Sequence, residues 1–303
     1  MHIGTARTAL FNWLFAKKHG GAFVLRIEDT DKERSTKKFE ENILCGIEWL
    51  GLAWDEGPNG NGEFGPYRQS ERGPVYARYV EKLFSAGHAY YCFCTEEDLE
   101  SERQAMLAAG RAPKYSGKCR NRSAADASKN IASGKDSVIR FRMPEEKIAV
   151  DDMVRGKTLF DMALVGDIAI AKKPEAPFYN LAVVVDDFEM KISHVIRGEE
   201  HFANTPKQIA IGEALGIPRP KFAHIPLILN PDRSKMSKRH GATSVEEYRD
   251  AGYLPDALLN FLALLGWHPL PEVDRETGKV IEREIFTLAE LIERFDIERV
   301  QKG

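Results

Sequence analysis

The sequence lacks the features that mark membrane, secreted and strongly basic proteins. None of its apolar runs approaches the length of a membrane span, and its N-terminus has no signal-peptide pattern. The net charge of −3 excludes a histone-like protein, although a local basic face could still bind nucleic acid. Only four cysteines are present, which argues against a secreted disulfide framework and favours a metal site in a reducing compartment. We therefore expect a cytoplasmic protein.

The sequence also lacks internal repeats and low-complexity tracts, and its patterns indicate an α/β fold. Hydrophobic residues make up 43% of the 303 residues, which is enough for two domains and a sizeable core. Strand-like and helical patterns alternate, except between about 90 and 175, where an insertion between two halves of a doubly wound sheet is indicated. The strand-like runs are 22–27, 138–141, 192–197 and 222–229. The helical patterns run from Ala6 to Leu14, from Phe39 to Leu50, from Tyr76 to Phe84, onwards from Thr205, onwards from Thr243 or Ser244, over 257–265 and over 288–295.

Several helix ends carry recognisable signals. Gly20 can end the first helix in a left-handed cap. Thr205 followed by Pro206 is typical of a helix start with proline in the first turn. Either Thr243 or Ser244 can cap the helix after the last strand.

Four polar residues follow the first strand: Glu28, Asp29, Thr30 and Asp31. One of them is enough to cap the next helix. A ligand amine or hydroxyl is an equally good partner for the others, so both interpretations stay open.

A cationic loop carrying Arg233, Lys235, Lys238 and Arg239 follows the 222–229 run. In an open α/β sheet, ligands bind beyond the carboxyl ends of the strands, so these cations would face the ligand. Flexible lysines suit a polyphosphate whose charge moves during reaction. The alternative is a solvated charge run without function.

Three cysteines, Cys92, Cys94 and Cys119, flank a polar helical segment. Thiolates that meet at one point suit Zn²⁺. The alternative is free thiols packed as small hydrophobic groups, as we expect for Cys45. Because the usual two-residue gap is absent, the spacing alone leaves both open.

Three separated motifs become informative in combination. They are His-Ile-Gly at 2–4, Arg-Ile-Glu-Asp-Thr-Asp at 26–31 and Lys-Met-Ser-Lys-Arg at 235–239. In this order and on these elements, the chain resembles the class I aminoacyl-tRNA synthetases, specifically the glutamyl-tRNA synthetase family. The resemblance is loosest between about 120 and 175. Further matching stretches are 65–72, 183–187, 194–201 and 262–267.

The resemblance implies a Rossmann-like doubly wound parallel sheet, with an inserted α+β acceptor-binding domain and a C-terminal helical extension. It divides the chain into a first catalytic half (1–89), the insertion with a zinc knuckle (90–175), a second catalytic half with the Lys-Met-Ser-Lys-Arg loop (176–242) and an incomplete helical stem-contact region (243–303).

The family ligates glutamate to tRNA(Glu) in two steps, through glutamyl-adenylate made from L-glutamate and ATP. The protein's part is positioning and charge stabilisation. The resemblance gives His2, Gly4, Lys235 and Lys238 catalytic roles at the phosphates, with Ser237 also at the ATP site. Mg²⁺ is expected with ATP, held mainly by phosphate oxygens and water.

For glutamate, the resemblance assigns Glu28 to the α-amino group, Tyr179 and Arg197 to the side-chain carboxylate, and Glu200 to the same pocket. An arginine fork suits a carboxylate better than an amide. The alternative for Arg197 is a structural ion pair with a nearby acid, namely Asp186, Asp187 or Glu199. If it binds substrate, Arg197→Ala should remove glutamate-dependent activity with little change in melting temperature.

Zinc-bearing members of the family show a similar Cys-x-Cys and Tyr-x-x-x-Cys pattern, which assigns Cys92, Cys94, Tyr115 and Cys119 to the metal. Some members complete the site with a histidine where this chain has Asn121, so the fourth ligand is Tyr115 or water. The knuckle is surrounded by cations with no acid between 111 and 122, a candidate contact for the tRNA acceptor backbone. These cations are Arg111, Lys114, Lys118, Arg120 and Arg122.

The family carries a strand before the His-Ile-Gly signature, with an arginine and a Ser-Pro turn, where this chain has only Met1. We therefore expect a chain truncated at both ends, a sheet without one central strand, and a pocket without one of two carboxylate-binding arginines.

Two other functions stay open. One is that of the short paralogue that loads glutamate onto a modified anticodon base, a glutamyl-Q tRNA(Asp) synthetase. The Lys-Met-Ser-Lys-Arg signature and the helical extension after Trp267 argue against it. The other is a catalytically inactive tRNA-binding protein. A monomer that does not bind membranes is expected in each case.

Overall fold

The computed structural model describes residues 1–30, 35–60, 62–229, 243–274, 276–281 and 283–302. A four-stranded sheet with the order β4-β3-β8-β7 lies at its centre. The strands β7 and β8 pair in parallel, β8 continues in parallel to β3 at Asp152, and β4 is antiparallel to β3. The strands are β3 (Lys147–Asp152), β4 (Gly156–Asp161), β7 (His194–Gly198) and β8 (Lys221–Ile225).

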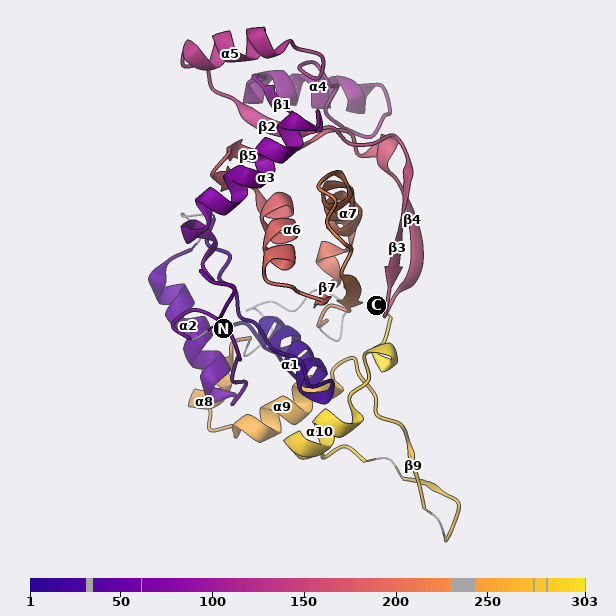
Figure 1. The fold of residues 1–303 in the computed structure, drawn as a ribbon. Helices are drawn as coiled ribbons and strands as arrows, with labels where there is room; N and C mark the ends of the chain where they lie inside the picture. Colours follow the sequence, from indigo (N-terminus) through magenta and orange to yellow (C-terminus); the bar gives the residue numbers. More distant parts are fainter. Residues whose placement is uncertain (31–34, 61, 230–242, 275, 282, 303) are drawn as a thin grey trace.

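Helices α6 (Tyr179–Glu189) and α7 (Thr205–Ala214) flank this sheet, and α7 contacts β3 (Figure 1). Helix α7 begins with Pro206 in its first turn, as expected, but its N-cap is Asn204. Thr205 is not the cap because its backbone is already helical, and its hydroxyl group bonds within the site described below.

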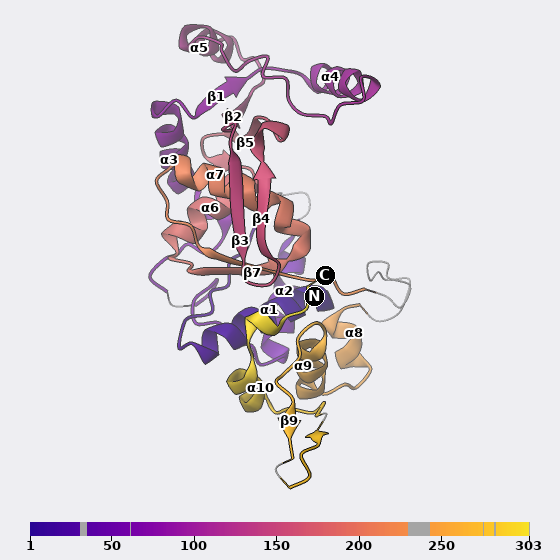
Figure 2. The same cartoon turned by 90° about the vertical axis from the view of Figure 1, so that its right-hand side faces the viewer.

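A second sheet lies at one end of the molecule with two exposed helices (Figures 1 and 2). It is antiparallel, with the order β1-β2-β5-β6. Its strands are β1 (Ala89–Cys92), β2 (Val138–Phe141), β5 (Ile168–Lys173) and β6 (Ala176–Pro177), and the helices are α4 (Glu96–Ala108) and α5 (Ala124–Ala132).

The N-terminal part forms α1 (Ile3–Lys18), α2 (Lys37–Trp49) and α3 (Gly73–Ser85). Helix α1 is followed by Gly20 at φ +64°, which confirms the left-handed cap expected there. The 22–27 run is not a strand of either sheet: only single bridges link Val24 to Glu56 and Ile27 to Arg68. The strand prediction was wrong because the run pairs with two separate segments, near 56 and near 68, and forms a continuous ladder with neither.

The polar run after residue 27 does not cap α2, whose N-cap is Thr36. Glu28 instead pairs with Arg26, and Asp29 accepts hydrogen bonds from the backbone and hydroxyl group of Ser70. The capping interpretation is therefore wrong for these two acids, and Asp31 lies outside the described residues.

The C-terminal part forms the opposite end of the molecule (Figure 2). Ser244 caps α8 in a capping box with Glu247, so of the two alternatives Ser244 is the cap. The elements are α8 (Val245–Asp250), α9 (Pro255–Leu264), β9 (Glu272–Val273), β10 (Val280–Ile281) and α10 (Leu288–Arg294).

Two apolar cores hold these layers together. One joins α1 to α9 and α10 and contains the buried side chains of Phe11, Trp267 and Phe295. The other lies among α3, α6, α7 and both sheets and includes Tyr76 and Leu181. Within the described residues, we find no helix of the length and apolarity that a membrane crossing requires.

Two further expectations differ from the structure. The 222–229 run forms a strand only to Ile225, because Pro226 has no N–H with which to continue the ladder. Cys45 is exposed and not packed as a small hydrophobic group. The cationic loop, with Arg233, Lys235, Ser237, Lys238 and Arg239, lies outside the described residues.

Candidate functional site

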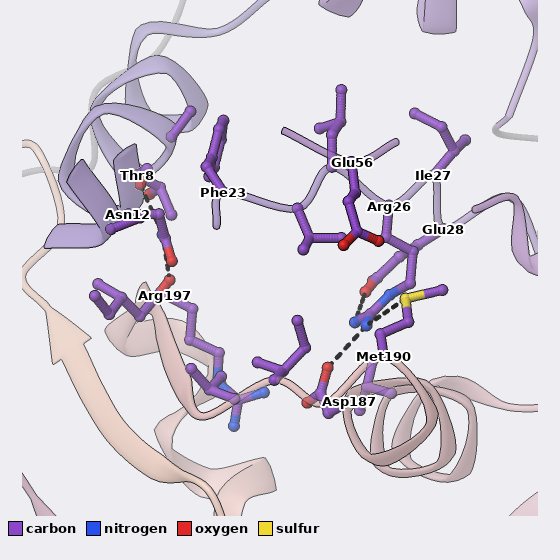
Figure 3. A pocket seen from close by; sticks show the side chains of 18 of the residues that line it. Thr8, Asn12, Phe23, Arg26, Ile27, Glu28, Glu56, Asp187, Met190 and Arg197 are labelled. Atoms are coloured by element: carbon purple, nitrogen blue, oxygen red, sulfur yellow. Dashed lines mark hydrogen bonds and ion pairs between the residues drawn. The ribbon is translucent and has the colours of Figure 1, made fainter. Parts of the chain in front are cut away.

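A cavity of about 1950 Å³ opens between α1, the 22–29 segment, α2, α6 and β7. Thr8 and Asn12 of α1 form one wall, and Asn12 donates to the carbonyl oxygen of Ile196 in β7 at 2.8 Å. Figure 3 shows Arg197 on one side of this hollow and the group formed by Arg26, Glu28 and Asp187 on another. Two opposite charges therefore face one space from different elements.

Arg197, near the carboxyl end of β7, is held by neutral acceptors. Its Nε donates to His224 Nε2 at 3.0 Å and its Nη1 to the Tyr179 hydroxyl group at 3.3 Å. Its Nη2 donates to Thr205 Oγ1 at 2.9 Å and to Gln208 Oε1 at 2.8 Å. Guanidinium has five N–H groups, so one Nη1 N–H keeps no partner among the described residues.

The structural ion pair considered for Arg197 is not formed. Asp186 and Asp187 pair with Arg26, and Glu199 pairs with Arg155. Within the described part of the chain, no carboxylate lies within ion-pair distance of Arg197. Its positive charge is thus oriented but not neutralised, and it lines the cavity.

Glu28 is the acidic counterpart across the hollow. Its carboxylate accepts from Arg26 at 2.9 Å and keeps 39% of its side-chain surface exposed. Arg26 also donates to Asp187 at 2.8 Å. Burial on its own would lower the pKa of Arg26, but the carboxylates of Asp187, Glu28 and Asp186 outweigh it and raise the pKa. Burial raises the pKa of Asp187 despite the nearby Arg26. Glu28 is the accessible carboxylate of the group and can accept from an ammonium group.

Tyr179 opens α6 and reaches between Arg197 and His201, whose Nδ1 lies 3.1 Å from its hydroxyl oxygen. Burial raises the pKa of Tyr179, so its phenol stays protonated and can donate to an anion. Burial and the charge of Arg197 lower the pKa of His201, which keeps that imidazole neutral. Tyr179 and Arg197 thus form one donor group.

His2 is the N-cap of α1, and its Nδ1 accepts from the Gly4 N–H at 3.0 Å. A Cβ on Gly4 would lie 3.1 Å from that Nδ1, so glycine leaves room for the ring. Thr5 lines the cavity, whereas His2 and Gly4 lie outside its lining, at the exposed end of the helix. This places His2 where the helix dipole favours an anion.

Glu200 is exposed and does not line the cavity. Its carboxylate packs over Gly198, where a Cβ would come within 2.1 Å of it. Together with Glu199 it opposes the effect of burial, which lowers the pKa of Arg7 to about 10. The structure therefore groups Glu28, Tyr179 and Arg197 but places Glu200 apart.

Several residues at the site were not assigned from the sequence. Arg26, Asp187 and His201 lie within the motifs that carry the resemblance, so those motifs could have identified them as site residues. His224 is a lone polar residue in an apolar run. Thr205, Gln208 and Asp152 had no sequence signal of a role here.

The cysteine cluster lies at the other sheet. The sulfur atoms of Cys92, Cys94 and Cys119 all lie within 4.8 Å of one another. The Tyr115 hydroxyl oxygen is 3.3 Å from Cys92 Sγ and 3.6 Å from Cys94 Sγ. Burial raises the pKa of Cys119, but hydrogen bonds from the Phe93 backbone and from Tyr115 lower it to about 7. Burial raises the pKa of Cys94 to about 12, so Cys119 is the more acidic of these two thiols. Three sulfurs with one phenol oxygen could hold a metal ion.

The basic residues around this cluster differ in their partners. Lys118 pairs with Asp98 at 3.0 Å and Arg120 with Asp167 at 3.3 Å. Lys114 donates to the carbonyl oxygen of Ala163 at 2.7 Å, and the Arg122 guanidinium lies 5.6 Å from the centre of the Phe93 ring. For Arg111, no carboxylate lies within ion-pair distance among the described residues.

Comparison with known proteins identifies the family of the chain. The family described as tRNA synthetases class I (E and Q), catalytic domain, matches residues 1–303. A glutamate--tRNA ligase of Carboxydothermus hydrogenoformans is 55% identical over 304 aligned residues, which cover 100% of this chain and 61% of that protein.

Two solved structures are similar over 100% of this chain and 64% of theirs, at 38% identity and a TM-score of 0.88. One is the glutamate-tRNA synthetase of Elizabethkingia anophelis. The other is the glutamate tRNA ligase of Elizabethkingia meningosepticum in complex with its amino acid. The chain thus spans about two thirds or less of the length of these relatives.

Proposed function

Because the chain belongs to the family of class I tRNA synthetase catalytic domains for E and Q, we propose that it acts as a glutamate–tRNA ligase. The fold expected from the motifs, an α/β class I synthetase fold, is confirmed by this membership. One observation carries the choice of glutamate: Arg197 faces the cavity with a charge that no described carboxylate neutralises.

The pocket has complementary groups for both ends of glutamate. The α-ammonium group donates to Glu28, whose carboxylate is already oriented by Arg26. The side-chain carboxylate accepts from the remaining Nη1 N–H of Arg197 and from the Tyr179 hydroxyl group. A carboxamide in the same place would direct N–H groups at a cation, so glutamine binds less well.

Activation needs the phosphates of ATP near the start of α1. His2 and Gly4 would receive them there, because the N–H groups and the dipole at the start of a helix favour an anion. Mg²⁺ supplies charge neutralisation when bound with ATP. Lys235, Ser237 and Lys238 are proposed at the same phosphates from the resemblance, and Lys238 would meet the departing pyrophosphate.

We further propose Zn²⁺ as the ion of the cysteine cluster, held by Cys92, Cys94 and Cys119 with Tyr115 as the fourth ligand. The metal ion would hold Cys92, Cys94 and Cys119 together next to the N-terminus of α4. The adjoining basic side chains would then contact the tRNA acceptor backbone.

The four-part division at residues 89, 175 and 242 remains part of the proposal. Two features bear on it: β6 continues the insertion sheet to Pro177, and the β3–β4 hairpin joins the central sheet through β8. A cytoplasmic monomer is proposed as the working state. Mg²⁺ with ATP and tRNA(Glu) complete its partners.

ATP–pyrophosphate exchange with tRNA present tests the function. Exchange should depend on glutamate and fall strongly with glutamine. The same assay can be run on a chain extended by the strand that the family carries before the His-Ile-Gly signature. The difference in exchange rate measures the contribution of that segment, and equal rates would show that it is not needed.

A second assay separates the alternatives. Esterification of glutamate to the 3′ end of tRNA(Glu) supports the ligase, whereas labelling of a modified base in tRNA(Asp) would select the glutamyl-Q function. Intact tRNA binding without any exchange in either chain would select an inactive tRNA-binding protein.

A further inference from the structure

His224 and Asp152 are two buried polar side chains behind Arg197. Hydrogen bonds connect Asp152 to His224 and His224 to Arg197. His224 in β8 is 1% exposed and Asp152 at the end of β3 is 3% exposed. His224 Nδ1 lies 2.6 Å from Asp152 Oδ2, and its Nε2 accepts from Arg197 Nε at 3.0 Å. A carboxylate, an imidazole and a guanidinium thus stand in a row that ends at the cavity.

Asp152 fixes which nitrogen of His224 carries the proton. Its Oδ1 accepts the backbone N–H groups of Val154 at 3.0 Å, Arg155 at 2.8 Å and His224 at 3.2 Å. Burial would raise the pKa of Asp152, but the bonds from the His224 ring and these amides lower it, so it is a carboxylate. A carboxylate only accepts, so Nδ1 must donate, and Nε2 keeps its lone pair as an acceptor for Arg197 Nε. The Thr205 hydroxyl oxygen also lies 3.1 Å from Nε2.

The imidazole must also remain neutral for this arrangement. Burial and the charge of Arg197 lower the pKa of His224, although Asp152 opposes this. An imidazolium would turn an N–H towards the Arg197 Nε–H and place two cations in contact. The rings of Phe202 and Phe222, with centres 5.1 and 6.3 Å from that of His224, exclude water from it.

Orientation through a neutral ring leaves the charge of Arg197 available. A carboxylate placed directly against the guanidinium would orient it equally well but would also compete with the substrate. We propose that the Asp152–His224 pair positions Arg197 for the side-chain carboxylate of the substrate and thereby contributes to the preference for carboxylate over carboxamide. This inference rests on the function proposed above.

The substitution Asp152→Asn tests the arrangement through the tautomer. The amide oxygen can keep the three backbone bonds now made by Oδ1, so the amide nitrogen faces His224 Nδ1. The ring proton then moves to Nε2 and points at the Arg197 Nε–H, a clash of two donors. We expect KM for glutamate to rise roughly ten- to a hundredfold and KM for ATP to remain unchanged. The ratio of kcat/KM for glutamate to kcat/KM for glutamine should fall.

Imidazole ¹⁵N chemical shifts give a readout that does not depend on activity. In the wild type, His224 should show Nδ1 protonated and Nε2 unprotonated, with the signal assigned by its loss in His224→Gln. In Asp152→Asn, Nε2 should be protonated and Nδ1 unprotonated.

Matched variants keep the test independent of folding. Asp167→Asn removes another buried carboxylate, which accepts from Tyr90 and the Met143 amide and pairs with Arg120. It is distant from Arg197 in the fold and should leave KM for glutamate unchanged. His224→Gln keeps an acceptor for Arg197, whereas His224→Phe keeps only the ring volume. We expect KM for glutamate to increase in the order wild type, Gln, Phe.

The outcomes separate this inference from the proposed function. If the wild type shows no glutamate-dependent exchange, the proposed function fails, and the tautomer measurement still decides the arrangement. If the wild type uses glutamate but His224→Phe and Asp152→Asn keep its KM and its preference, the positioning role is overturned. A wild-type His224 protonated on Nε2 would overturn it as well.

Discussion

At the scale of single residues, the site depends on where uncompensated charge lies. Arg26 is surrounded by carboxylates, so its charge is used within the protein. Arg197 is surrounded by a hydroxyl, a phenol, an amide and an imidazole, so its charge is available to a ligand. Two arginines of equal chemistry therefore have different roles because of their neighbours.

Removing Arg197 should affect binding far more than folding. We expect Arg197→Ala to raise KM for glutamate at least a hundredfold, since a charge-assisted bond of about 1.5–3 kcal/mol and the charge itself are lost. The melting temperature should fall by a few degrees and not stay unchanged, because His224, Thr205 and Gln208 lose their donor. Kinetics and thermal denaturation check this; a large loss of stability with an unchanged KM would make Arg197 structural.

One buried and two partly buried histidines predict how stability depends on pH. Burial lowers the pKa values of His194, His201 and His224. Below the unfolded value of about 6.5, the unfolded chain binds protons that the folded protein does not, so stability falls as pH falls. Each histidine adds at most about 1.4 kcal/mol per pH unit.

Urea unfolding between about pH 7 and pH 5.5 measures this slope, since most carboxylates titrate lower. His224→Gln should give a shallower slope than the wild type. A stability that stays constant over this range would contradict the prediction.

At the scale of elements, the cysteine knuckle joins β1 to the loop after α4. Its three thiols and Tyr115 come together although 23 positions separate Cys92 from Tyr115 in the sequence. Only a small apolar cluster supports this contact, so a metal ion would supply much of the local stability.

Chelation should therefore expose thiols selectively. In protein purified without chelator, a thiol reagent should react rapidly with one cysteine, the exposed Cys45, and with all four after zinc removal. Cys45→Ser should remove the rapid reaction and leave the chelator-dependent one. Zinc well below one ion per chain, or four equally rapid thiols before chelation, would count against the metal site.

At the scale of the whole molecule, the basic face and the amino-acid cavity lie in different parts of the fold. The knuckle lies beside α4 and the second sheet, whereas the cavity lies between α1 and β7. Figure 1 shows α4 and α1 in different parts of the molecule. A tRNA that contacts both must therefore span several elements, with its affinity supplied mainly by phosphate contacts.

Salt dependence of tRNA binding distinguishes the basic residues. Arg111→Gln should reduce the slope of log K against log salt by about 1, because its guanidinium has no described carboxylate partner and is available to a phosphate. Lys118→Gln is the matched control and should change the slope less, since Asp98 already holds that ammonium group. Equal slopes for Arg111→Gln and the wild type would remove this face from the interface.

Much of this protein was determined by local sequence. The ends of some helices followed from caps, as with Ser244 and Gly20, because those signals act within a few residues. Helices α5 and α6 were not predicted. The family was evident from three short motifs, because they occur together and in a fixed order along the chain. The clustering of Cys92, Cys94 and Cys119 was also expected, and the structure brings them together.

Tertiary structure decided the rest, because those features depend on residues distant in the sequence. Whether 22–27 forms a strand depended on its neighbours, which are loops at 56 and 68. The hydroxyl group of Thr205 bonds Arg197 instead of capping α7, and Asp152 reaches His224 from 72 positions away. Sequence periodicity records which face of an element is buried, but the partner of a buried polar atom is set only when the sheets and helices pack.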